Sequence, residues 1–381
     1  MPQTMSRTLT VTRLLTDKAD PGRTALRTTS EPAAAAPGEV ILSPDLFSLT
    51  TNNITYAAFG EAMSYWDFFP TGEAGFGQMP VWGFADVVAS AVEGITVGER
   101  FYGYWPIASH LRMRPDRVSD RGFYDASEHR LPLTSAYNQY SRCSADPSYA
   151  AADEAWLALY RPLFVTAFML ADYLQDNLAF GARRLLISSA SSKTAYATAF
   201  CLGDNAAGTE AGAGAEAPEL IALTSPRNRD FVTGLGAYRR TVVYADIETL
   251  DADKPTLYVD FSGDNDLRAR IHHHFGTALT HDCFAGSAAN TDFLSPVDLP
   301  GPAPQFYFAP HQIKKRNADW GPAEVNRRLH TAQSRFIAHV AAARPPWMRL
   351  VAATGFDAAA TVIRTLADSG GDPAEGHVVT L

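Results

Sequence analysis

Cysteine is scarce in this 381-residue sequence, and no apolar run is long enough to cross a membrane. Cys143, Cys201 and Cys283 are odd in number and widely spaced, which excludes a disulfide framework and a four-cysteine zinc site. The most apolar stretch, residues 163–178, is interrupted by polar side chains, whereas a membrane helix needs roughly 20 apolar residues. The beginning of the sequence has no continuous apolar segment of the kind found in secretory signals. We therefore expect a cytoplasmic protein with no membrane partner.

Positive charge is also in deficit, with 32 Lys and Arg against 41 Asp and Glu and a formal net charge of −9. This balance does not create the cationic surface that binds a phosphate backbone, so we expect no nucleic-acid partner. Hydrophobic residues make up 46% of the chain and charged residues 19%, which is typical of an ordinary globular protein. At roughly 150 residues per domain, the length indicates two to three domains.

The pattern of apolar residues changes near residue 160. Before that point, short apolar runs end in glycine turns, as at residues 87–98, which favours a β-rich barrel. After it, strand-like and helix-like segments alternate, beginning with a buried strand at residues 184–189 and a helix at 192–202. The alternation predicts an α/β fold with a doubly wound parallel sheet.

The most informative segment is the turn of small residues that follows the strand at 184–189. Between a strand and a helix, such a turn points backbone N–H groups and the positive end of the helix dipole at an anion. Hydroxyl groups would add donors, and a lysine would add positive charge. The residues that predict this pyrophosphate site are Ser189, Ser191, Ser192, Lys193 and Thr194. The glycines of the usual dinucleotide fingerprint are absent, and serines also cap helices for purely structural reasons.

The residues after the next strand, at 220–224, favour NADP over NAD. An NAD site usually carries an acidic residue there for the ribose hydroxyls, and this sequence has none. Thr224, Ser225 and Arg227 instead offer hydroxyls and a cation that suit an additional 2′-phosphate. The alternative is that Arg227 and Arg229 simply form an exposed helix start.

Several motifs resemble the medium-chain dehydrogenase/reductase superfamily. Residues 80–90 (PVWGFADVVAS) and 97–103 (VGERFYG) resemble its GroES-like catalytic domain. Three further segments resemble the remaining sequence pattern of this superfamily. They are the nucleotide segment at 185–195, the Gly-Ala pair at 236–237 and the ending GHVV at 376–379. The resemblance spans nearly the whole chain.

This resemblance implies two domains and further cofactor-site residues. A GroES-like β-rich catalytic domain would comprise residues 1–158 and 313–381, and a Rossmann dinucleotide-binding domain would comprise residues 159–312. Tyr244 and Ser262, which lie at the ends of the two following strands, would complete the NADP site.

A narrower resemblance is to an uncharacterised family related to these reductases, known by a domain-of-unknown-function label. It is carried by YWDFFP at 65–70, YNQY at 137–140, RPLF at 161–164 and SASSKTA at 189–195. The strand at 305–308 resembles the edge through which related dimers pair their sheets, which implies a homodimer.

The resemblance also implies that no catalytic zinc is present. Zinc-dependent members carry a cysteine and a Gly-His-Glu in the first domain, where this sequence reads TNNITY at 51–56 and GFA at 83–85. His272, His273 and His274 do not offer another metal site, because adjacent residues on a helix point about 100° apart. A solvated helix end is the simpler interpretation of the three histidines.

Without a metal, the resemblance points to the quinone-reductase and enoyl-reductase branches, in which NADPH gives hydride to an activated double bond. Such a reaction needs a proton donor close to the developing enolate, and tyrosine suits this task. By alignment, Asn53 and Tyr56 lie where zinc-free members place polar residues near the nicotinamide. Tyr65 follows in the adjacent loop, and Tyr140 lies where the first domain turns towards the cleft. Packing is the alternative role for each tyrosine, since a chain with 15 of them buries several.

We therefore predict a zinc-independent, NADPH-dependent oxidoreductase that reduces a small-molecule alkene, quinone or carbonyl. One alternative is a catalytically degenerate binding or scaffold protein of the same fold, whose turn no longer binds a pyrophosphate. Another is a damaged ATPase or GTPase phosphate-binding loop at residues 192–194, although both glycines of that motif are absent.

Overall fold

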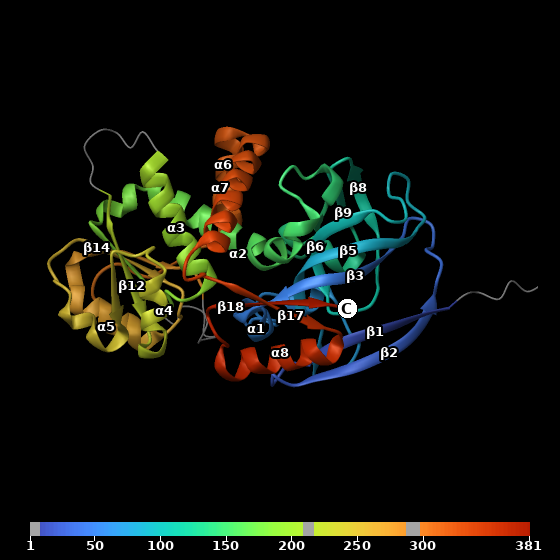
Figure 1. Cartoon of the computed structure of the whole chain (residues 1–381), viewed down its shortest axis with the longest axis horizontal. Helices are drawn as coiled ribbons and strands as arrows, with labels where there is room; N and C mark the ends of the chain where they lie inside the picture. The colour runs from blue at the N-terminus through green and yellow to red at the C-terminus, as the bar shows by residue number, and fades with distance from the viewer. Residues whose placement is uncertain (1–7, 209–216, 287–297) are drawn as a thin grey trace, which may run out of the picture. The chain divides into compact units, whose positions relative to one another are not determined.

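The computed structural model describes residues 8–208, 217–286 and 298–381, and the chain divides into two compact units (Figure 1). The first unit comprises Met1–Leu159 and Arg349–Leu381, and the second comprises Tyr160–Met348. Residues 313–348 therefore pack with the second unit, whereas the sequence interpretation groups 313–381 with the GroES-like domain. The assignment of functional domains stays a prediction.

Strands dominate the first unit. Their bounds are β1 (Thr8–Asp17), β2 (Thr24–Pro32), β3 (Val40–Leu49), β4 (Phe76–Gly77), β5 (Pro80–Ser90), β6 (Arg100–Pro106), β7 (Leu111–Met113), β8 (Pro115–Ser119), β9 (Gly122–Asp125), β10 (Gln139–Arg142), β17 (Arg349–Thr354) and β18 (Glu375–Thr380). A three-stranded sheet has the order β2-β1-β4. A nine-stranded sheet has the order β17-β18-β3-β5-β6-β10-β9-β8, and β7 pairs with β3. The pairs along β3, β5, β6, β10 and β9 are antiparallel, as in the predicted β-rich domain.

The core of the first unit lies on the nine-stranded sheet. Helix α1 (Thr51–Ala58) follows β3, and α8 (Phe356–Ser369) packs on β17 and β18. Ala359, Ile363 and Leu366 lie three or four residues apart, so α8 buries one face in this core. Gly83 permits the close approach of β3 and β5, because a Cβ atom there would lie 2.1 Å from the Leu46 carbonyl oxygen.

The second unit contains a six-stranded parallel sheet in the order β13-β12-β11-β14-β15-β16. The strands are β11 (Arg184–Ile187), β12 (Glu219–Thr224), β13 (Arg240–Val243), β14 (Thr256–Asp260), β15 (Leu279–Phe284) and β16 (Gln305–Phe306). The chain proceeds outward from β11 to β13 and then returns to the other side of β11 with β14. This order confirms the predicted doubly wound sheet, with its switch point between β11 and β14.

Most helices of this unit connect its strands, and the two that follow the last strand stand apart from the sheet (Figure 1). The helices are α3 (Lys193–Gly208), α4 (Arg229–Gly234), α5 (Asn265–Phe275), α6 (Ala309–Trp320) and α7 (Pro322–Ala342), preceded by α2 (Glu154–Asp176). Within the described ranges, the helix at residues 151–176 is the one that is long and apolar enough to span a membrane. Because 67% of its apolar window is buried inside the structure, it is a core helix.

Candidate functional site

The turn between β11 and α3, residues 188–192, is held by the protein's own groups. Ser189 has a φ of +46°, a left-handed conformation that usually favours glycine. Its backbone N–H donates to the Tyr244 hydroxyl at 3.0 Å, and its carbonyl accepts from the Ser192 N–H at 2.7 Å. The predicted turn thus exists, and a non-glycine residue occupies its most restrictive position.

Ser192 caps α3. Its hydroxyl accepts a hydrogen bond at 3.2 Å from the N–H of Ala195, the third residue of the helix. This is the structural role that serines commonly have at a helix start. The first-turn N–H groups of a helix nevertheless point along its axis, where the helix dipole favours an anion. Lys193 and Thr194 are both partly exposed in this first turn.

A hydrogen bond joins the turn to the loop after β12. The Asn228 side-chain N–H donates to the Ser191 hydroxyl at 2.9 Å, and Asn228 adjoins Arg227. The Tyr238 hydroxyl also donates to the Ala190 carbonyl oxygen at 3.1 Å. The structure therefore brings the residues predicted for the pyrophosphate and for the 2′-phosphate to the same edge of the sheet.

The loop after β12 offers one buried hydroxyl and one exposed cation. Thr224, the last residue of β12, is 1% exposed, and its hydroxyl has no hydrogen-bond partner within the described ranges. Ser225 is half-buried, and Arg227 is exposed. A buried polar atom without a partner is unusual, and a ligand hydroxyl or phosphate oxygen would satisfy it.

A buried network fixes the turn to the end of β14, and the sequence interpretation misses it. The Ser188 hydroxyl donates to Asp260 at 2.9 Å, and Arg268 forms an ion pair with the same carboxylate at 2.6 Å. The predicted Ser262 also donates to Asp260, at 2.7 Å. The available sequence signal was an aspartate at the end of an otherwise apolar strand. The network secures the switch point, where doubly wound sheets bind their ligands.

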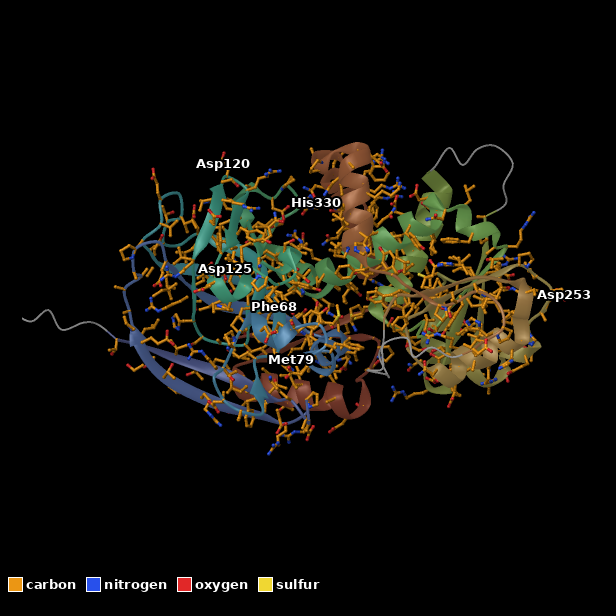
Figure 2. All side chains as sticks on the ribbon, turned by 180° about the vertical axis from the view of Figure 1, so that it is seen from behind. Phe68, Met79, Asp120, Asp125, Asp253 and His330 are labelled. Atoms are coloured by element: carbon orange, nitrogen blue, oxygen red, sulfur yellow. The ribbon has the colours of Figure 1, made fainter. Side chains whose placement is uncertain are left out.

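In the first unit, two of the predicted catalytic residues lie in a cluster of aromatic rings that includes Phe68 (Figure 2). The rings of Tyr56 and Tyr65 have centroids 4.8 Å apart. The Trp82 indole N–H donates to the Tyr56 hydroxyl at 3.1 Å. This aromatic cluster comprises Tyr56, Tyr65, Phe68, Phe69, Trp82, Tyr104 and Tyr137. Burial raises the pKa of the Tyr56 and Tyr65 phenols, which keeps them protonated at neutral pH.

Asn53 and Tyr140, the other two catalytic candidates, have structural partners. Asn53 accepts from the Thr50 N–H at 2.8 Å, which completes the capping box of α1, and it donates to the Pro80 carbonyl oxygen at 2.9 Å. Tyr140 is fully buried, and its hydroxyl donates to the Tyr104 carbonyl oxygen at 2.7 Å. Their roles in catalysis stay predictions, and their polar atoms are already engaged in these bonds.

Arg130 anchors the base of the aromatic cluster, and sequence reasoning does not single it out. Its side chain is 1% exposed and forms an ion pair with Asp125 at 2.8 Å. The same nitrogen donates to the Tyr140 hydroxyl at 2.8 Å. The guanidinium carbon lies 5.2 Å from the Phe68 ring centroid and 5.0 Å from that of Phe69. Figure 2 labels Phe68 and Asp125. A buried arginine of this kind is visible only once distant residues have been brought together.

The three consecutive histidines have different environments, which corrects the expectation of a solvated helix end. His273 is exposed, but His272 is fully buried because it lies on the face of α5 that packs on the sheet. The two ring nitrogens of His272 lie 2.8 Å from Asp282 and from the Pro300 carbonyl oxygen. Within residues 8–208, 217–286 and 298–381, no group of three or more His, Cys, Asp or Glu side chains could hold a metal ion.

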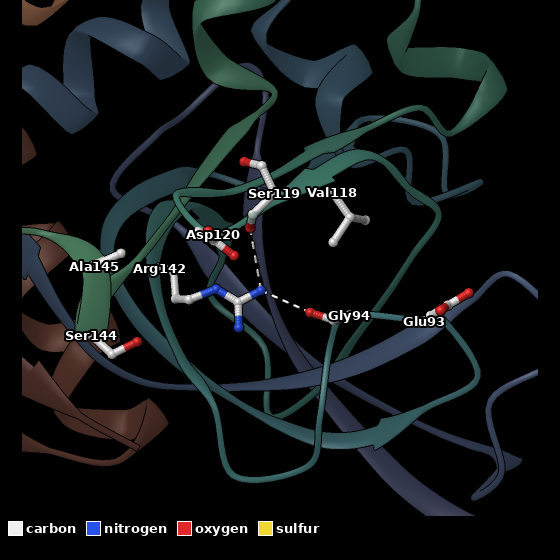
Figure 3. Close-up of a pocket in the computed structure, with 8 residues that line it drawn as sticks. All are labelled: Glu93, Gly94, Val118, Ser119, Asp120, Arg142, Ser144 and Ala145. Carbon is white, nitrogen blue, oxygen red and sulfur yellow. Dashed lines mark hydrogen bonds between the residues drawn. The ribbon is translucent and has the colours of Figure 1, made fainter.

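A separate cavity of about 550 Å³ lies in the first unit (Figure 3). Its lining residues are Glu93, Gly94, Val118, Ser119, Asp120, Arg142, Ser144 and Ala145. The Arg142 guanidinium donates to the carbonyl oxygens of Gly94, at 2.8 Å, and Ser119, and pairs with Glu99. Arg142 therefore stabilises the loops around the cavity. None of the residues that line this cavity is a predicted site residue.

A family model described as Protein of unknown function (DUF2855) matches residues 47–372. No curated protein matches the sequence. CurA from Vibrio vulnificus in complex with NADPH is similar at 13% identity and a TM-score of 0.57, over 97% of this chain and 98% of its own. A putative NADPH:quinone reductase from Mesorhizobium loti is similar at 10% identity and a TM-score of 0.57, over 98% of both chains.

A mutant form of enoyl thioester reductase from Candida tropicalis is also similar, at 12% identity and a TM-score of 0.52, over 98% of this chain and 100% of its own. At such identities the likeness establishes the fold alone. The whole-chain similarity confirms the predicted α/β architecture, with a GroES-like β-rich part and a Rossmann sheet.

Proposed function

The chain belongs to the DUF2855 family, as the sequence motifs predict, and from this premise we propose that it is a zinc-independent, NADPH-dependent reductase. The proposed substrate is a small activated alkene, quinone or carbonyl compound. The observation that carries the proposal is the bond from Asn228 to Ser191, which joins the two loops predicted to bind the cofactor phosphates. Two of the similar structures bear names that include NADPH, which supports the choice of cofactor.

The residues at the edge of the parallel sheet fit NADP. The N-terminus of α3, with Ser189, Ser191, Ser192, Lys193 and Thr194, would bind the pyrophosphate. Thr224, Ser225 and Arg227 would bind the 2′-phosphate, and the unpartnered Thr224 hydroxyl supports this fit. Tyr244 and Ser262 would complete the site. When bound, NADPH supplies the hydride that reduces the substrate.

The proton would come from the aromatic cluster. Tyr56 and Tyr65 carry neutral phenols, and we assign the proton donor to Tyr56, whose oxygen accepts a hydrogen bond from the Trp82 indole N–H. A cluster with few charged groups suits a neutral, planar substrate such as a quinone or an enone. Cytoplasmic location and a homodimer stay predictions.

One contact favours the alternative of a degenerate binding protein. Tyr244 already occupies the backbone N–H of Ser189, so that donor is not available to a phosphate. Replacing Ser191 with glycine separates the two functions. Tighter NADPH binding by Ser191→Gly would indicate a working but weakened site, whereas no change would favour a lost one.

Arg227→Ala tests the cofactor proposal. We expect the affinity for NADPH to fall about tenfold or more, because a hydrogen bond to a charged group contributes about 1.5–3 kcal/mol. Binding of NADH should be unchanged, since it has no 2′-phosphate. Isothermal titration calorimetry with both cofactors measures the two affinities.

The matched control is Arg328→Ala, which removes an exposed arginine of α7 that pairs with Glu324. It should leave both affinities unchanged. Equal losses for NADPH and NADH in Arg227→Ala, or no NADPH binding by the wild-type protein, would contradict the proposal.

A further inference from the structure

The hydroxyl groups of the predicted proton donors differ in how they use their single hydrogen. Tyr140 donates its hydrogen to the Tyr104 carbonyl oxygen. Tyr65 and Tyr137 lie 3.3 Å apart at their hydroxyl oxygens, so one of them donates to the other. Tyr56 accepts a hydrogen bond from Trp82, whose indole N–H can only donate. The Tyr56 hydrogen is therefore not used in that bond.

Tyr56 therefore holds the Trp82 N–H at its oxygen, and the Asn52 side chain also hydrogen-bonds with this hydroxyl. Tyr56 is 7% exposed, so most of its ring is enclosed by the aromatic cluster. Burial raises the pKa of this phenol, and its hydrogen bonds with Trp82 and Asn52 oppose the rise. Tyr56 is thus a neutral hydroxyl whose oxygen is held in place by the Trp82 indole N–H.

Trp82 is itself held in place. It lies on β5 directly opposite Tyr104 of β6. Its ring stacks on Tyr102 with centroids 5.7 Å apart and an interplanar angle of 19°. It also contacts the Tyr104 and Tyr137 rings, at centroid distances of 5.1 and 5.9 Å. A donor fixed by its surroundings can stabilise developing charge without first having to reorient.

We propose that Trp82 is a positioning residue that directs the Tyr56 hydroxyl and stabilises the phenolate that remains after Tyr56 donates its proton. This inference rests on the proposed reductase function. In the step, the substrate gains a hydride at one carbon, and the other end of the reduced π-system gains the Tyr56 proton. The Tyr56 O–H bond breaks, its electron pair stays on oxygen, and water reprotonates the phenolate.

A double-mutant cycle tests the inference. Its readout is the kcat for NADPH oxidation with the fastest acceptor from a panel of quinones and enones. Trp82→Phe keeps a ring but removes the N–H, and we expect kcat to fall about tenfold, because hydrogen bonds to charged acceptors are roughly twice as strong as neutral ones. Tyr56→Phe should lower kcat by roughly 10²-fold or more. In the Tyr56→Phe background, Trp82→Phe should have no further effect.

Affinity measurements and a control separate this role from a structural one. The KM for the acceptor and the NADPH affinity, measured by calorimetry, should change little in Trp82→Phe. Trp320→Phe, which removes an indole at the end of α6, should leave kcat unchanged.

In an active enzyme, Trp82→Phe could lower kcat by the same factor in the wild-type and Tyr56→Phe backgrounds. That result would overturn the role of Trp82 and leave the proposed function intact. Both proposals are overturned if the wild-type protein does not bind NADPH. They are also overturned if it binds NADPH but no acceptor in the panel leads to NADPH oxidation.

Discussion

His281 illustrates how the surroundings of a single side chain set its charge. It lies on β15, is 3% exposed, and stacks on the Phe180 ring at a centroid distance of 3.8 Å and an angle of 5°. Burial lowers the pKa of this imidazole to about 4 from an ordinary value of 6.5. The histidine is therefore neutral in the folded protein at neutral pH.

Stability should depend on this histidine in acid. Because the pKa of His281 is lower in the folded than in the unfolded chain, protonation favours unfolding. The contribution of the neutral His281 side chain to the free energy of unfolding is fully present above pH 6.5 and is lost as the pH falls towards 4. Between those pH values, we expect the free energy of unfolding of the wild type to fall about 2 kcal/mol more than that of His281→Phe.

Urea unfolding at several pH values measures this difference. The control is His273→Gln, which replaces an exposed histidine of α5 and should follow the wild-type curve. Parallel curves for the wild type and His281→Phe would show that His281 is not buried in its neutral form.

The segment between α2 and β11 contains a run of residues with left-handed backbone. Leu178, Ala179 and Phe180 have φ values of +49°, +48° and +51°, and Gly181 follows at +76°. Left-handed backbone costs roughly 1–2 kcal/mol per non-glycine residue. The turn places the Phe180 ring against His281, so the packing of one aromatic ring compensates part of this cost.

Replacing Ala179 with glycine should therefore stabilise the protein by about 1 kcal/mol, because glycine adopts the left-handed region without a steric penalty. The matched control is Ala338→Gly in the exposed interior of α7, which should destabilise by about 1 kcal/mol. Thermal and urea unfolding measure both changes. A loss of stability in Ala179→Gly equal to that of the control would show that residue 179 is not left-handed in solution.

The left-handed turn also marks where sequence patterns stop being informative. Leucine repeats at 170, 174 and 178 predict a helix, and the structure ends α2 at Asp176 and turns the chain at Leu178. Three non-glycine residues in this conformation have no local signature, because the energy that stabilises them comes from contacts such as that of Phe180 with His281, about a hundred residues away in the sequence.

For the chain as a whole, the sequence was sufficient for the architecture. Apolar periodicity and glycine turns separate a β-rich part from an alternating part, and the strand and turn around residues 184–195 lie where predicted. Periodicity is a local property, so it predicts elements and their order. Those elements then restrict the topology to a few arrangements.

The chemistry of the site was only partly predictable. The serines and Arg227 each belong to a local sequence pattern, and the structure brings the two patterns together at one edge of the sheet. The bonds of Ser188 to Asp260 and of Trp82 to Tyr56 join positions far apart in the chain. No spacing rule connects such residues, and the buried state of His272 likewise depends on which face of α5 meets the sheet.

The proposed function requires that a turn made of serines at the start of α3 binds the pyrophosphate of NADPH. A crystal structure of the protein with NADPH at saturating concentration would show where the pyrophosphate binds. We expect the pyrophosphate within hydrogen-bonding distance of the backbone of residues 192–194 and the 2′-phosphate beside Arg227. Crystals that contain no cofactor, or that bind it away from the start of α3, would overturn the proposed cofactor site.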